Sequence, residues 1–134
     1  MKTIKEITII DYDAGNLFNI VSTLKKLNIK LNVTKNPKKI IKAEKIIIPG
    51  VGAFKEGIDS LKKKNLFYAL KEFLILERPL LGICLGMQYL MSVSHEFKKT
   101  SGLNFFDGEV VKFDQKKVKK LPHIGWNYIK LNKN

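Results

Sequence analysis

The sequence contains one cysteine, one arginine and one tryptophan among 134 residues. A single cysteine excludes an intrachain disulfide and the small secreted scaffolds that depend on several, so a reducing cytoplasm is the expected compartment. The longest uncharged apolar run, near residues 79–89, is interrupted by Gly82 and Gly86 and is too short to cross a bilayer. The first six residues carry charges where a secretion signal would be apolar. We therefore expect no membrane partner.

Acidic residues are also scarce: the chain has 12 of them and 25 basic residues, which gives a formal net charge of +13. This balance raises the hypothesis of nucleic-acid binding, which would give an affinity that falls steeply with salt. Arginine, whose planar guanidinium suits phosphates and base edges, occurs only as Arg78. The lysines are scattered in pairs and triplets, and joint enrichment in Lys, Ile and Asn is typical of an AT-rich coding sequence. We expect no nucleic-acid partner.

What is present is a globular composition, with 45% hydrophobic and 28% charged residues. The length fits one domain, residues 1–134. Runs of β-branched residues alternate with segments of helical periodicity. Strands are predicted over 6–12, 29–34, 45–48 and 79–83, and helices over 17–27, 36–41, 53–77 (one or two, with a break near 64–65) and 85–93. This order predicts an α/β fold with a mostly parallel sheet and helices on both faces.

The last third of the chain has a different pattern. Residues 98–104 are polar and predict a loop, and residues 105–113 predict a hairpin with a two-residue turn at Asp107–Gly108. Strand character returns at 126–129. In parallel sheets, ligands bind beyond the carboxyl ends of the strands, where the glycine-bearing turns at Gly15, Gly50 to Gly52 and Gly82 to Gly86 are expected.

The segment Gly82-Ile83-Cys84-Leu85-Gly86 stands between a predicted strand and a predicted helix. A glycine, a nucleophile and a second glycine in this register are typical of a nucleophile elbow, in which a tight turn exposes the central side chain. The sulfur of Cys84 is expected at a helix N-terminus, where the dipole favours the thiolate, with the N–H of Leu85 available to an oxyanion. A buried, inert cysteine is the alternative, and the paired glycines favour the nucleophile.

The segment Pro49-Gly50-Val51-Gly52 follows another predicted strand and is a candidate for the second oxyanion donor, because glycines let backbone N–H groups approach a ligand. It lacks the Gly-Lys-Ser/Thr of a phosphate loop. A thiolate that cleaves an amide also needs a general acid and base. His95 and His123 are the available histidines, and neither has the spacing or acidic neighbour of a triad member. We expect a surface His95, pointing away from the elbow along a continuous helix, and a packing or interface role for His123.

Together with Ile9-Ile10-Asp11-Tyr12, Gly15-Asn16 and the 121–127 segment Leu-Pro-His-Ile-Gly-Trp-Asn, these motifs resemble the class I, triad-type glutamine amidotransferases. More narrowly, they resemble the glutaminase subunits of imidazole glycerol phosphate synthase. The resemblance covers about residues 6–127. The Cys84 elbow carries the match to the class, and the 121–127 segment narrows it. The resemblance implies a flavodoxin-like three-layer fold.

The resemblance implies that Cys84 attacks the side-chain amide of glutamine and gives a γ-glutamyl thioester and ammonia. Water then hydrolyses the thioester, which releases glutamate and frees Cys84. The implied residue roles are an oxyanion hole at Val51, Gly52 and Leu85, substrate binding at Gly50 and Gln88, and partner contacts at Asn16 and Trp126. No cofactor and no metal is implied. The ammonia passes to a (βα)8-barrel cyclase subunit of histidine biosynthesis, in a cytoplasmic heterodimer.

One departure from the family is clear in the printed sequence. The family carries its catalytic His and Glu in a Phe-His-Pro-Glu segment well after the Gly-Trp-Asn motif, and no such segment occurs among these residues. We expect the last strands of the sheet to be missing, an open sheet edge, and little or no glutaminase activity of this chain alone. A smaller departure is the segment 92–96, where the family tends to be more acidic. Two alternatives stay open: a paralogous subunit for amidation of surface-polysaccharide sugars, and a non-catalytic remnant.

Overall fold

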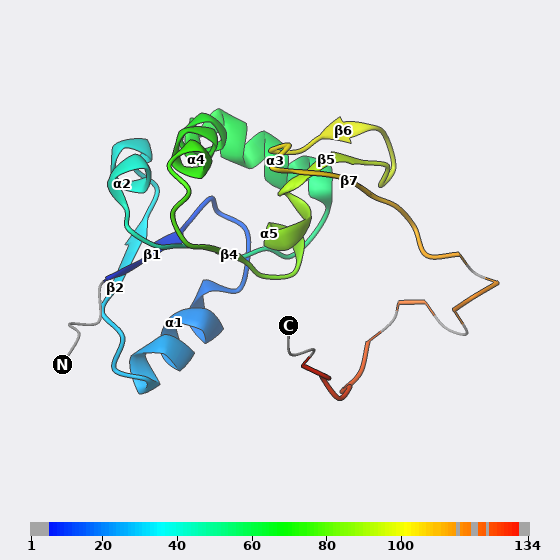
Figure 1. Ribbon diagram of the computed structural model, residues 1–134, viewed down its shortest axis with the longest axis horizontal. Coiled ribbons are helices and arrows are strands. Elements are labelled where there is room, and N and C mark those ends of the chain that lie inside the picture. Colours follow the sequence, from blue (N-terminus) through cyan, green and yellow to red (C-terminus); the bar gives the residue numbers. More distant parts are fainter. Residues whose placement is uncertain (1–5, 115, 119–120, 123, 132–134) are drawn as a thin grey trace.

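The computed structural model describes residues 6–114, 116–118, 121–122 and 124–131. Four strands alternate with helices in the first part of the chain. These elements are β1 (Ile7–Ile10), α1 (Leu17–Lys26), β2 (Leu31–Thr34), α2 (Pro37–Lys42), β3 (Ile46–Ile48), α3 (Phe54–Lys63), α4 (Leu66–Ile75), β4 (Leu80–Gly82) and α5 (Leu85–Gln88). The strands form a parallel sheet in the order β2-β1-β3-β4. Helix α1 covers one face, and α2, α3 and α4 lie on the other (Figure 1). The predicted α/β fold is confirmed.

Local sequence signals account for the helix boundaries. The Oδ1 of Asn16 accepts a hydrogen bond from Asn19 N–H and caps α1, and Asn36 caps α2, in which Pro37 occupies the first turn. The break predicted near residue 65 is real, because Asn65 has a left-handed backbone with φ of 59° between α3 and α4. Asparagine tolerates this conformation better than most residues.

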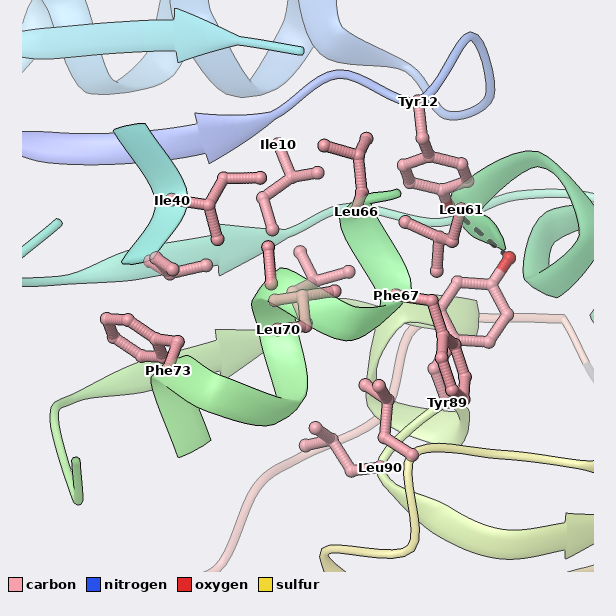
Figure 2. Close-up of a cluster of buried hydrophobic side chains, with 14 of the residues drawn as sticks. Ile10, Tyr12, Ile40, Leu61, Leu66, Phe67, Leu70, Phe73, Tyr89 and Leu90 are labelled. Carbon is pink, nitrogen blue, oxygen red and sulfur yellow. Dashed lines mark hydrogen bonds between the residues drawn. The ribbon is translucent and has the colours of Figure 1, made fainter. Parts of the chain in front are cut away.

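The core lies between the sheet and the helices of the α3 and α4 side (Figure 2). Strand β3 is buried throughout because both of its neighbours are strands and both of its faces are covered, so an unbroken run of isoleucine suits it. The helices contribute an apolar stripe of fully buried side chains, namely Phe54, Ile58, Leu61, Leu66, Leu70 and Phe73. Tyr12 and Tyr89 complete this core at the carboxyl end of the sheet.

The helix predicted over 85–93 is wrong beyond its first turn. Helix α5 ends at Gln88, and the chain enters a second sheet through β5 (Met91–Ser94), which lies between β6 (Thr100–Ser101) and β7 (Phe106–Val110). The carbonyl of Tyr89 accepts from Leu103 N–H at 2.7 Å, and that of Leu90 accepts from Phe105 N–H at 2.9 Å. Because the returning chain uses these carbonyls, they are not available to a longer helix.

Two further local predictions in this region are wrong for the same reason. Asp107 and Gly108 do not form a hairpin turn but lie inside β7, which pairs with β5 in parallel with a register shift between Met91 and Val93. The polar stretch predicted as a loop includes β6, which pairs antiparallel to β5. Pairing with β5, which the pattern of these residues alone does not report, decided both assignments.

The strand predicted over residues 126–129 is also absent. This stretch has no regular secondary structure, and its side chains are exposed. In Figure 1 the last described residues run apart from both sheets. A β-rich pattern forms a strand only where a partner strand is in reach, and none pairs with it among the described residues.

Candidate functional site

The turns that follow β1, β3 and β4 meet at the carboxyl edge of the parallel sheet. A Cβ added at Gly15 would lie 3.4 Å from Cβ of Pro49, so the first turn contacts the second. A Cβ at Gly50 would lie 2.7 Å from Cβ of Leu85, so the second turn contacts the third. The glycine-bearing turns predicted to border a ligand site are therefore in mutual contact, as expected for parallel strands.

Cys84 occupies a strained turn between β4 and α5. Its φ of 56° and ψ of −117° are rare for any residue with a side chain, and conformations of this kind cost about 1–3 kcal/mol. The residue is nevertheless exposed, and its carbonyl accepts from Met87 N–H at 3.0 Å. A strained backbone under an exposed cysteine is the geometry of a nucleophile elbow. The alternative of a buried, inert cysteine does not fit this exposure.

The two glycines that flank the elbow have steric reasons to be glycine. A Cβ at Gly82 would lie 2.6 Å from both Cα and N of Met87, and one at Gly86 would overlap the carbonyl oxygen of Ile48. That carbonyl accepts a hydrogen bond from Ile83 N–H at 2.9 Å. The turn that carries Cys84 therefore packs closely against the end of β3. The helix behind Cys84 is a single turn, so its dipole is weaker than the predicted nine-residue helix would provide.

The predicted oxyanion donors come from two segments that the fold brings together. Val51 and Gly52 are exposed, and Gly52 has a φ of +98°, which favours glycine. Leu85 is the first residue of α5, a position whose N–H has no partner within the helix. The N–H groups of Val51, Gly52 and Leu85 donate to none of the residues that the structure describes.

A pair of tyrosines that the sequence did not indicate lies beneath this site. Tyr12 and Tyr89 are fully buried, and their hydroxyl oxygens lie 3.4 Å apart. The Tyr12 hydroxyl donates to the carbonyl of Pro49 at 2.7 Å. Figure 2 shows the two rings side by side at the edge of the core. No sequence signal finds this pair, because 77 positions separate its members.

The remaining predicted positions differ in burial. Gln88 is half-buried at the end of α5, Asn16 caps α1 and is exposed, and Trp126 is fully exposed. Glu96, noted from the sequence only as part of the 92–96 departure, accepts from Phe54 N–H at 2.7 Å. It thereby caps α3, whose N-cap residue Ala53 has no polar side chain.

Of the two histidines, His95 is the one that lies in the described part of the chain, and it pairs with a residue of the second sheet. His95 is exposed, as predicted, and its Nε2 lies 3.0 Å from Oε2 of Glu109 on β7. The predicted reason was wrong, since β5 and not a continuous helix separates His95 from the elbow. His123 lies outside the described residues. Within those residues, no cluster of three or more His, Cys, Asp or Glu side chains is arranged to hold a metal. No helix there has the length and apolar character to span a membrane.

Comparison with known proteins adds an independent line of evidence. The family described as glutamine amidotransferase class-I matches residues 8–132. A relative from Carboxydothermus hydrogenoformans, imidazole glycerol phosphate synthase subunit HisH, is 46% identical over 89% of this chain and 59% of its own length. Subunit HisH 1 from Campylobacter jejuni (strain RM1221) is 44% identical over 95% of this chain and 64% of its own length. The chain thus spans 59% to 64% of these two curated relatives.

The fold has a counterpart among solved structures. The crystal structure of a protein described as a candidate peptidase E from Listeria monocytogenes EGD-e aligns with a TM-score of 0.62 and covers 80% of this chain and 66% of that one. At 14% identity, this likeness concerns the fold alone.

Proposed function

Because this chain belongs to the class-I glutamine amidotransferase family, we propose that residues 1–134 form one amidotransferase domain that carries the nucleophile of a glutaminase site. The observation that supports this most directly is the exposed Cys84 on its strained turn, with φ of 56° and ψ of −117°. Strain of this kind persists only where the surrounding structure holds it, and it clusters at functional sites.

In the proposed reaction, the Cys84 thiolate attacks the side-chain amide carbon of glutamine, and the carbonyl π electrons move to oxygen. The N–H groups of Val51, Gly52 and Leu85 donate to that oxyanion. Gly50 and Gln88 border the bound glutamine. Collapse of the adduct expels protonated nitrogen as ammonia and leaves a γ-glutamyl thioester, which water hydrolyses to glutamate.

Expulsion of ammonia needs a proton donor, and hydrolysis needs a base. The family resemblance implies that a Phe-His-Pro-Glu segment supplies the proton donor and the base, and the printed sequence contains no such segment. In the described residues, His95 pairs with Glu109 and not with Cys84. We therefore expect these residues by themselves to form a covalent adduct but to turn glutamine over slowly or not at all.

The relatives at 41–46% identity that carry the HisH name favour the imidazole glycerol phosphate synthase branch of the family. We propose that the chain acts in histidine biosynthesis, in the cytoplasm, as one half of a heterodimer with a (βα)8-barrel cyclase that consumes the ammonia in its lyase step. Asn16 and Trp126, both exposed, are the proposed contacts to the barrel.

Covalent capture by a chloromethyl ketone analogue of glutamine tests the site. The sulfur displaces chloride, which leaves with its bonding electron pair, so the adduct lacks chlorine and is read by mass spectrometry of the Cys84 peptide. We expect saturable labelling of the wild type that glutamine slows, and none at this position in Cys84→Ala. Labelling that glutamine does not slow would contradict a glutamine site at Cys84.

Glutamate release is the second measurement on the same protein. We expect release by this chain, alone or with the barrel subunit, to stay far below that of an intact family member. Turnover at the intact rate that disappears in Cys84→Ala would show that another residue of the chain supplies the acid and the base.

A further inference from the structure

Two buried hydroxyls have no part in the chemistry described so far. Tyr12 follows β1 and Tyr89 follows α5, and neither side chain reaches solvent. Space for the Tyr89 hydroxyl depends on Gly57, where a Cβ would overlap that oxygen. The Tyr89 ring also packs edge-on against Phe54, with ring centroids 5.4 Å apart. The hydroxyl is thus held in one place by the core around it.

The hydrogen bonds of this pair run in one direction. The single hydroxyl hydrogen of Tyr12 is donated to the carbonyl of Pro49, at 2.7 Å. Tyr12 is therefore the acceptor in its 3.4 Å contact with the Tyr89 hydroxyl, which donates. Linked hydroxyls of this kind polarise one another, so the donation from Tyr89 strengthens the bond from Tyr12 to Pro49.

The carbonyl at the end of this chain of bonds belongs to the root of the Gly50–Gly52 loop. Because a peptide unit is planar, fixing the oxygen of Pro49 also fixes the N–H of Gly50. Val51, a proposed oxyanion donor, is the next residue. On the other side, the N–H of Tyr89 donates to the carbonyl of Leu85 at 3.1 Å, and Leu85 carries the other proposed donor.

We propose that Tyr12 and Tyr89 are positioning residues that fix two segments relative to one another. These segments are the Gly50–Gly52 loop and the start of α5 at Leu85, which carry the proposed oxyanion donors. The inference rests on the proposed glutaminase function. The hydroxyls touch no substrate. They act through the Pro49 carbonyl, whereas Tyr89 is tied to Leu85 by its backbone N–H. Burial, before any other cause, raises the pKa of both tyrosines. Both hydroxyls therefore keep the hydrogens that these bonds need at neutral pH.

The test compares two electrophiles on the full chain. The ketone oxygen of the chloromethyl ketone analogue takes the place of the amide oxygen, whereas iodoacetamide alkylates the sulfur by direct displacement of iodide and needs no oxyanion site. In Tyr12→Phe we expect the maximal labelling rate with the ketone to fall about tenfold, the effect of about one hydrogen bond in the transition state. The half-saturating ketone concentration and the iodoacetamide rate should stay within about twofold of wild type.

Two further variants make the result specific. Tyr89→Phe leaves the bond from Tyr12 to Pro49 in place, so we expect a smaller fall, between that of Tyr12→Phe and wild type. Tyr68→Phe is the matched control, because Tyr68 is an exposed tyrosine on α4 whose hydroxyl bonds to none of the described residues. It should behave as wild type.

Equal ketone rates in wild type and Tyr12→Phe would overturn the proposal, and so would a parallel fall in the iodoacetamide rate, which reports a displaced elbow. Should Tyr12→Phe unfold at the assay temperature, Tyr89→Phe decides alone, and a wild-type ketone rate there refutes the pair. Failure of the proposed function gives a different result, since the wild type itself would then show no saturable labelling by the ketone.

Discussion

At position 86, the absence of a side chain lets the elbow lie against the end of β3. A Cβ there would overlap the carbonyl oxygen of Ile48, and backbone at both ends of that contact has little room to move. We expect Gly86→Ala to lower the free energy of unfolding by about 1–3 kcal/mol, as overpacking does. Urea unfolding followed by circular dichroism measures it. Gly125→Ala is the control, since nothing lies within 4 Å of a Cβ there, and equal midpoints for the two variants would refute the steric argument.

Tyr89 should make the folded state sensitive to alkali. Its pKa in the folded protein lies above the ordinary value of 10.0, mainly because of burial and then because it donates to Tyr12. Above pH 10 the unfolded chain releases this proton while the folded chain retains it. The stabilising contribution is therefore complete below pH 10 and is lost as the pH rises further.

We expect Tyr89→Phe to lose less stability than wild type between about pH 9 and pH 11, as measured by urea unfolding at each pH. Lysine deprotonation affects both proteins alike, so the difference between them isolates the tyrosine. Tyr68→Phe, which removes an exposed hydroxyl, should follow the wild type. A wild-type pH dependence in Tyr89→Phe would show that its hydroxyl ionises as easily when folded as when unfolded.

Among the elements, α1 depends on its cap more than the other helices do, because none of its side chains is fully buried. The Asn16 side chain accepts from Asn19 N–H at 3.2 Å. We expect Asn16→Ala to lower the free energy of unfolding by about 1 kcal/mol and Asn16→Asp to retain the cap. Thermal unfolding measures both.

The same two variants separate the cap of Asn16 from its proposed contact with the barrel subunit. Asn16→Asp keeps the cap and removes the amide nitrogen. We expect it to weaken binding to the barrel without loss of stability. If Asn16→Asp bound the barrel subunit with wild-type affinity, the proposed contact would be refuted, and capping of α1 would be the role that remains for Asn16.

For the molecule as a whole, two surface features stand out: the edge of the parallel sheet at β4 and the exposed side chain of Trp126. Among the strands that the structure describes, β4 pairs only with β3, and Leu81 on β4 is 55% exposed. Trp126 is fully exposed at 104% of its reference area. An open sheet edge offers unpaired backbone groups to another segment, and tryptophan is enriched at the centres of protein interfaces.

Trp126 offers a direct test because it is the single tryptophan of the chain. With 5-fluorotryptophan incorporated, we expect the barrel cyclase subunit to shift its fluorine NMR signal, and Trp126→Ala to weaken binding about tenfold or more, as for a central interface aromatic. Phe97→Ala is the control, because Phe97 is another strongly exposed aromatic and lies between β5 and β6. Binding that leaves the fluorine signal unmoved would refute Trp126 as an interface residue.

Prediction from sequence succeeded where the signals were local and failed where they were not. The isoleucine run of β3 and the break at Asn65 each depend on a few neighbouring residues, and both were predicted. The strained turn at Cys84 was expected from two glycines. The end of α5, by contrast, depends on hydrogen bonds from residues 103–106, which a pattern over 85–93 does not contain.

The sequence by itself therefore determined the parallel α/β order, the family and the candidate nucleophile. The steric demands of a tight turn and the periodicity of buried side chains both depend on residues that are close together in the sequence. Only the tertiary structure decided that β5, β6 and β7 form a second sheet, that the loop after β3 lies against the elbow, and that Tyr12 and Tyr89 meet beneath it. These depend on contacts between residues 6 to 77 positions apart, whose energies arise only when the chain has closed on itself.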